Sequence, residues 1–356
     1  MDSQSKDFLK KLLAAAAPAG FEDPATDVWK KYVEQFVSPV KSETRGSRYA
    51  IINEDAAKKI LVVGHSDEIG LMVNYIDDNG FVYVAPIGGM DPMVLLSQRV
   101  RILTQNGPLF GVISKKAIHL MDRGKKDEIP KLYNLWVDIG AKDKKEAEEL
   151  IQVGDPIIWG GDFEEMRNDL AVARNFDDRS GCYVSGELMR RLSEHADKGN
   201  LKVGVVGAAS VCEEVGNGGA GMLAERLRPA LAIAVDVNHD TNIPSVEKKR
   251  FGDIKCGLGP CLTKGVRTSR TAFALMEKAA KAKEIPYQID IDMGRTGTDA
   301  DSMYHRASGT PISLISIPCR YMHTSTEVIN LEDMDKSVDI LVEFVLSLDE
   351  NISFGR

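Results

Sequence analysis

The sequence predicts an α/β fold in which a mostly parallel sheet is flanked by helices and is interrupted by an inserted β-rich domain. Four short apolar runs have the composition of buried strands, and segments with helical spacing alternate with them in residues 1–67 and 168–356. Residues 68–167 differ, because short β-type runs dominate there. We therefore expect a main domain built from 1–67 and 168–356, with 68–167 inserted as a second domain.

Helical periodicity locates the helices of the main domain. An amphipathic helix at the N-terminus ends near Pro18, and its short apolar stretch and charged residues distinguish it from a signal peptide. A second helix follows Asp178, and a third covers about 270–284. The last helix begins near Asn330, whose side chain can cap it, with Asp333 three residues further on.

Short β-type runs separated by turn residues characterise the inserted segment. Asn79-Gly80 and Asn106-Gly107 predict tight hairpin turns, because both residue types tolerate positive φ. Lys144–Ile151 is the one helix that we expect there. The predicted strands are Gly70–Ile76, Phe81–Ile87, Gln98–Thr104, Pro108–Ser114, Leu132–Ile139 and Pro156–Trp159.

Composition and charge limit the classes of function. The 356 residues include 45 Lys and Arg against 53 Asp and Glu, a net charge of −8, whereas a nucleic-acid-binding protein would show a basic stripe. No apolar run approaches the roughly 18 residues of a membrane span, so we expect no membrane partner. The five cysteines form no CxxC pair, which predicts reduced thiols in a cytoplasmic protein rather than disulfides or a thiolate zinc site.

Residue types that bind metal ions follow the apolar runs at their carboxyl ends. Open α/β sheets place their chemistry in the crevice at this edge, and histidines with carboxylates are ligands that zinc accepts. A further acidic pair, Asp177-Asp178, precedes the second predicted helix. The candidates at the strand ends are His65, the neighbours Glu213 and Glu214, Asp236 and His323.

Taken alone, His65 and the pair Asp177-Asp178 each have a simpler interpretation. His65 can be a surface histidine in a polar turn, or a ligand whose second ring nitrogen donates to Asp67. Asp177-Asp178 can be a helix N-cap, because an aspartate there accepts backbone N–H groups. Both interpretations of this pair can hold together, with Asp177 on a metal and Asp178 structural.

The remaining candidates are also ambiguous one at a time. Glu213 and Glu214 can form a solvated acidic turn, but neighbours in an extended segment point to opposite sides, so one can bind metal while the other faces a water. Asp236 can be a plain turn residue, and His323 a loop histidine with its hydrogen bonds satisfied. Taken together, the set suits two cations about 3.5–4 Å apart, which predicts a metal-assisted hydrolase.

Two other functions stay open on the residues alone. A glycoside hydrolase would use Glu213 with Asp177 or Asp236 as a carboxylate pair, but it would leave His65 and His323 without a role. A metal-stabilised scaffold without turnover would need no general base. Replacing Glu213 by Gln would therefore change nothing measurable in a scaffold, whereas it would abolish hydrolysis in an enzyme.

Seven motifs in order make the chain resemble the glutamyl or deblocking, TET-type metalloaminopeptidases, whose members are often labelled cellulases or endoglucanases. The resemblance covers essentially the whole chain. The motifs are His65-Ser66-Asp67-Glu68-Ile69-Gly70-Leu71-Met72, Ile87-Gly88-Gly89-Met90-Asp91-Pro92, Asp177-Asp178-Arg179-Ser180-Gly181, Glu213-Glu214-Val215-Gly216, Val235-Asp236-Val237, Gly297-Thr298-Asp299-Ala300 and Arg320-Tyr321-Met322-His323.

This resemblance implies a zinc-peptidase-like catalytic domain with two divalent metal ions per subunit. Zinc is the expected metal, with cobalt and manganese as alternatives. Carried over by motif, His65 and Asp236 would hold one ion, Glu214 and His323 the other, and Asp177 would bridge them.

The resemblance also implies the activity and the assembly. Glu213 would be the general base, Asp67 would orient His65, and the enzyme would remove N-terminal residues from short peptides. The inserted segment would be a PDZ-like dimerisation domain, in a homo-oligomer that is a dimer or a dodecamer. The side-chain preference stays open, because Ser47, Cys212 and Asn238-His239 depart from the family's usual residues, although none of them is a proposed ligand.

Overall fold

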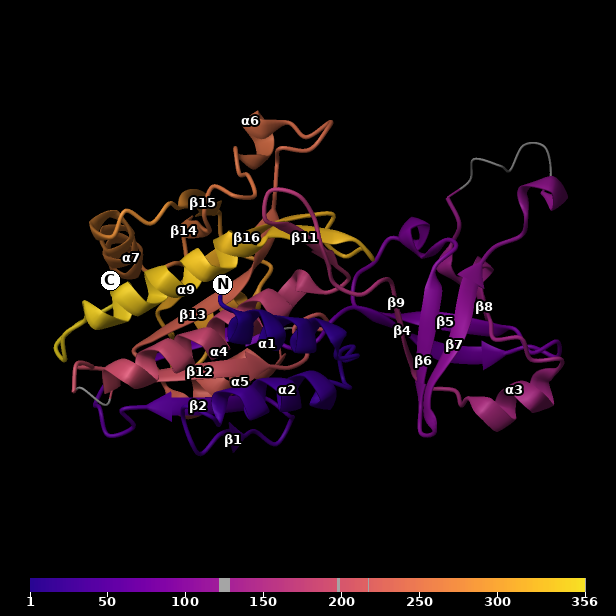
Figure 1. Ribbon diagram of the computed structural model, residues 1–356, viewed down its shortest axis with the longest axis horizontal. Helices are drawn as coiled ribbons and strands as arrows, with labels where there is room; N and C mark the ends of the chain where they lie inside the picture. The colour runs from indigo at the N-terminus through magenta and orange to yellow at the C-terminus, as the bar shows by residue number, and fades with distance from the viewer. Residues whose placement is uncertain (122–128, 197–198, 217, 356) are drawn as a thin grey trace.

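A computed structural model describes residues 1–121, 129–196, 199–216 and 218–355. It consists of a large sheet covered by helices and, at one end of its long axis, a smaller β-barrel (Figure 1). No helix in the described ranges combines the length and the hydropathy needed to cross a membrane. All five cysteines are free thiols.

Four parallel strands form the centre of the sheet. They lie in the order β12 (Gly204–Ser210), β3 (Lys59–His65), β13 (Leu231–His239) and β16 (Ile312–Arg320). Their apolar residues are buried on both faces, as expected for parallel strands between helix layers. Because the strands are parallel, their carboxyl ends meet at one edge.

The prediction of a mostly parallel sheet is wrong outside this centre, because the sheet is mixed. On one side β2 (Arg48–Ile52) pairs antiparallel with β12, and on the other β17 (Glu327–Asn330) pairs antiparallel with β16. The link between β16 and β17 is far shorter than the dozen or more residues that a parallel crossover needs. The other strands of this sheet are β1 (Lys41–Ser42), β10 (Glu164–Glu165), β11 (Leu170–Ala173), β14 (Cys261–Gly265) and β15 (Gln288–Asp292).

Helices cover both faces of the sheet. Alternate residues of β3 point to opposite faces, so Ile60 and Val62 pack in one core while Leu61 and Val63 pack in another. The first core includes α1 (Ser3–Ala14), α2 (Asp23–Val33), α4 (Phe176–Ala196), α7 (Arg270–Ala282) and α9 (Leu331–Leu346). The second includes α5 (Gly218–Leu227) and α8 (Asp299–Tyr304), and a short α6 (Lys248–Phe251) projects from the sheet (Figure 1).

The predicted helices are present, and one capping detail differs. The Asn330 side chain accepts a hydrogen bond from the backbone N–H of Glu332, so the predicted cap of α9 is confirmed. Asp333 does not reach back to this cap. Its carboxylate instead accepts the N–H groups of Gly257 and Gly259.

Six strands of the inserted segment close into a barrel with its own apolar core. Their order is β4 (Gly70–Ile76), β5 (Val82–Ile87), β8 (Trp136–Asp138), β7 (Gly107–Ser114), β6 (Arg99–Thr104) and β9 (Pro156–Trp159). The expected strand at Leu132–Ile139 is shorter than predicted, because Leu132–Asn134 form a 3-10 turn. The expected helix is α3 (Lys144–Leu150), and two further 3-10 turns cover Pro92–Leu95 and Ile118–Leu120.

Candidate metal centre

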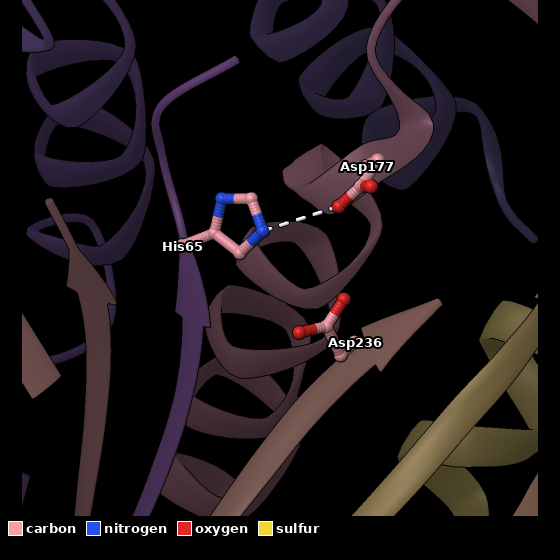
Figure 2. A group of neighbouring side chains, drawn as sticks. All are labelled: His65, Asp177 and Asp236. Atoms are coloured by element: carbon pink, nitrogen blue, oxygen red, sulfur yellow. Dashed lines mark hydrogen bonds and ion pairs between the residues drawn. The ribbon is translucent and has the colours of Figure 1, made fainter. Parts of the chain in front are cut away.

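Three of the predicted residues meet at the carboxyl edge of the sheet. His65 is the last residue of β3, Asp236 lies within β13, and Asp177 lies at the start of α4 (Figure 2). One ligand atom from each lies within 4.8 Å of the others. All three are buried, so Asp236 is not the plain turn residue that was one interpretation of it.

A second group shares Asp177 with the first. Asp177, Glu214 and His323 also offer ligand atoms within 4.8 Å of one another. Oδ1 of Asp177 lies 3.1 Å from Nε2 of His65, and Oδ2 lies 3.2 Å from Nε2 of His323. The two oxygens of one carboxylate therefore face two different imidazole rings, which is the arrangement that a bridging carboxylate requires.

Two glycines allow α4 to approach the sheet closely enough to deliver Asp177. A Cβ atom built on Gly64 would lie 2.2 Å from the carbonyl carbon of Gly181 in α4. A Cβ on Gly181 would lie 2.5 Å from the carbonyl oxygen of Val235 in β13. Asp178 itself accepts the backbone N–H groups of His65 and Gly181, so it links the start of α4 to β3.

The Glu327 carboxylate accepts hydrogen bonds from the backbones of two predicted ligands. Its Oε2 accepts the N–H of Asp177 at 3.0 Å, and its Oε1 accepts the N–H of His323 at 2.8 Å. The sequence analysis missed this residue. It acts through backbone N–H groups, one of them 150 residues away at Asp177, and its position in an ordinary strand, β17, gives no local signal.

Backbone carbonyl groups fix both histidine rings. Nδ1 of His323 lies 2.7 Å from the carbonyl oxygen of Gly89, in the loop that follows β5 of the barrel. Nδ1 of His65 lies 3.1 Å from the carbonyl oxygen of Asp67. An N–H at Nδ1 leaves Nε2 as an electron-pair donor, which is the tautomer that a metal ligand needs.

The Asp67 carboxylate contacts more than His65. Its Oδ1 lies 3.5 Å from Nδ1 of His65 and also accepts the N–H of Glu213 at 3.1 Å. Its Oδ2 accepts the N–H of Glu214 at 3.0 Å. One buried carboxylate therefore fixes the backbone of both adjacent glutamates, and this was not expected from the sequence.

The electrostatics of the cluster favour bound cations. Burial raises the pKa of Glu213 and of Glu214 to about 8, and the pKa of Asp236 is raised well above its usual value by burial and by Asp178 and Asp177. Among the described residues, no Lys or Arg forms an ion pair with Asp177, Glu214 or Asp236. Divalent cations would supply the missing positive charge, so this donor set fits a metal centre.

Three neighbouring residues belong to neither ligand group in the described part of the chain: Asp240, His239 and Cys212. Asp240, which follows His239 at the end of β13, is buried and pairs with Arg320 at 2.7 Å. His239 is exposed and belongs to neither ligand group in the described ranges. Cys212 donates its N–H to the buried carboxylate of Glu22, beside the Glu213 backbone.

Comparisons with known proteins agree with this geometry. Residues 46–340 match the model of a family described as M42 glutamyl aminopeptidase. A lysyl aminopeptidase of Pyrococcus furiosus is 31% identical over 342 residues, covering 94% of each chain. A TET aminopeptidase from Thaumarchaeota archaeon SCGC AB-539-E09 superposes with a TM-score of 0.92 at 30% identity, covering 97% of each chain. The Pyrococcus horikoshii TET1 peptidase, which can assemble into a tetrahedron or a large octahedral shell, has a TM-score of 0.85 at 28% identity over 97% of this chain and 100% of its own.

Proposed function

The chain belongs to the M42 glutamyl aminopeptidase family and is a metal-dependent aminopeptidase, and from this premise we propose that its carboxylate–histidine cluster is a dinuclear centre. The observation that carries the proposal is the position of Asp177, whose two oxygens face the two histidines at 3.1 and 3.2 Å. His65 and Asp236 would hold one ion, and Glu214 and His323 the other, with Asp177 between them.

Zinc is the metal that we propose for both positions. Zinc accepts histidine nitrogens and carboxylate oxygens as ligands, and cobalt or manganese would bind the same set more weakly. When bound, two such ions acidify a water and polarise the scissile carbonyl group.

Glu213 is the proposed general base. It lies beside the ligand Glu214 but belongs to neither ligand group, and burial raises its pKa to about 8. A carboxylate with a raised pKa can accept a proton from the attacking water and then donate it to the leaving amine. Asp67 would position this base through the N–H groups of Glu213 and Glu214, and it would help to orient His65.

The substrates that we propose are short peptides with a free N-terminal amine. That amine would bind near the acidic groups of the cluster, which would make the enzyme an exopeptidase. The glycoside hydrolase alternative is not favoured by the comparisons, and the scaffold without turnover is excluded by membership of a peptidase family.

Residues 68–167 are the proposed inserted, PDZ-like domain, and residues 1–67 and 168–356 the catalytic domain. The closed barrel with its own core supports this division, although the Gly89 carbonyl also contributes directly to the position of His323. We propose a homo-oligomer, dimer or dodecamer, because the related TET1 peptidase forms large shells. The free cysteines support a cytoplasmic location.

A metal titration tests the dinuclear centre. After chelation the protein should lose hydrolysis of aminoacyl-anilides, and zinc should restore the rate until two equivalents per chain have been added. A rate that survives chelation, or that saturates at one equivalent with one ion bound, would contradict the proposal. Measuring bound metal in the same samples separates loss of metal from loss of fold.

A further inference from the structure

A cavity of about 760 Å³ lies outside the metal centre, and none of the proposed ligands lines it. It is lined by residues 265–271, 304–305, 308–311 and 354–355. Thr268 in this lining pairs with Ile312, the first residue of β16, whereas His323 follows the other end of that nine-residue strand. Asp236 of the cluster pairs with Ser316, four residues along β16 from Ile312, so at 3.3 Å per residue the two sites are about 13 Å apart along the sheet.

The charged side chains of the cavity are all basic, although the chain carries a net charge of −8. These charged residues are Arg267 and Arg270, His305 lies beside them, and none of the described Asp or Glu residues lines the cavity. Arg267 is partly neutralised, because its Nη1 lies 2.9 Å from Asp301. Arg270 is exposed and forms no ion pair with any described residue, so its charge is available to a ligand.

The start of α7 adds to the positive potential of the cavity. Arg270 is the first residue of this 13-residue helix, and no acidic residue lies in its first turn. The first N–H groups of a helix lack intrahelical acceptors, and the Ser269 side chain accepts only that of Ala272. A cation at this end opposes the helix dipole, so the arrangement is electrostatically unfavourable unless an anion binds.

Hydroxyl and apolar groups complete the lining. Thr271 and Ser308 donate no side-chain hydrogen bond to another described residue, so both are free to contact a ligand. Val266, Tyr304 and Phe354 supply apolar surface. The volume lies in the range of small-molecule sites and far exceeds what a bare inorganic anion fills.

We propose that this cavity binds a small organic phosphate, with the phosphate at the N-terminus of α7 and Arg270 and the organic part against the apolar wall. A phosphate monoester carries nearly two negative charges and three acceptor oxygens. It therefore matches a helix N-terminus, a guanidinium and two hydroxyl groups better than a carboxylate, which has two oxygens and one charge.

Calorimetric titration of the metal-loaded protein tests the site, with adenosine 5′-monophosphate, inorganic phosphate and adenosine as probes. We expect the two phosphates to bind and adenosine not to bind. Arg270→Glu should weaken adenosine 5′-monophosphate binding by at least tenfold, because it reverses the charge at the phosphate position. Aminopeptidase activity should be unchanged, which also reports a folded protein.

Lys278→Glu is the matched control. Lys278 lies on the same helix, is exposed and does not line the cavity, so the variant makes the same charge change without touching the site. We expect its affinity to stay within twofold of the parent. Phosphate that binds at the metal centre would do so with the same affinity in the parent and in both variants. Equal effects of the two variants, absence of phosphate binding, or tighter Arg270-dependent binding of N-acetyl-dialanine would overturn the proposal.

Discussion

Replacing Glu327 by Gln should weaken metal binding although Glu327 is not a proposed ligand. Glu327 accepts the N–H of Asp177 at 3.0 Å and that of His323 at 2.8 Å, one with each carboxylate oxygen. A glutamine side chain has the same shape but only one oxygen. Its amide group would therefore lose one of these hydrogen bonds and place a donor against a backbone N–H.

The size of the effect follows from the bond that is lost. Leaving a buried N–H without its acceptor costs about 1–3 kcal/mol, which corresponds to a factor of about 5 to 150 in affinity. Substitutions that disturb the groups orienting metal ligands also cost about 10–100-fold. Asp177 is shared by both ligand groups, so we expect both ions to bind more weakly.

Competition with a chromophoric chelator measures this affinity at a buffered zinc concentration. Glu332→Gln is the control, because Glu332 is a largely exposed glutamate whose one ion pair among the described residues is with Lys336, at 3.2 Å on the surface of α9. Its affinity should equal that of the parent. A Glu327→Gln protein that folds normally and binds zinc within twofold of the parent would refute the role assigned to these two hydrogen bonds.

Three further outcomes are expected. Asp67→Asn should lower kcat by about 10–100-fold at saturating zinc, because one of the N–H groups of Glu213 and Glu214 loses its acceptor. Initial rates within twofold of the parent at that zinc concentration would contradict this. Gly64→Ala should lower the free energy of unfolding by about 1–3 kcal/mol or more, since its Cβ would lie 2.2 Å from Gly181. The control Gly161→Ala, whose Cβ would have no atom within 4 Å, should leave the midpoint of urea denaturation unchanged. Equal midpoints for the two variants would show that the close approach is relaxed without cost. An N-acetylated aminoacyl-anilide should not be hydrolysed, and cleavage at the rate of the free amine would argue against an exopeptidase.

The strand ends were predictable because their signals are local. An apolar run followed by His65 or by Glu213 and Glu214 specifies both a buried strand and the residue at its end. The structure brings His65 and Glu214 together with Asp177, Asp236 and His323. The reason is that β3, β12, β13 and β16, which carry or precede four of these residues, lie parallel in the centre of the sheet. Their proposed roles as ligands and base rest on the resemblance and on this geometry.

Contacts between distant segments were not predictable in this way. The Gly89 carbonyl reaches His323 from the barrel, and Glu327 in β17 accepts the N–H of Asp177, which is 150 residues away, so neither residue type nor spacing reveals these contacts. Strand direction was also hidden, because alternation and composition do not distinguish an antiparallel edge from a parallel centre. The short link after β16 was the available signal for the antiparallel return.

The opposite roles proposed for two adjacent glutamates are tested most directly by comparing Glu213→Gln with Glu214→Gln. The two variants make the same chemical change at neighbouring positions, and each is assayed for bound zinc and for aminoacyl-anilide hydrolysis. We predict that Glu213→Gln retains two ions and loses hydrolysis, whereas Glu214→Gln loses metal as well as activity. Full activity in Glu213→Gln, or equal metal loss in both variants, would contradict the assignment of Glu213 as general base and Glu214 as ligand.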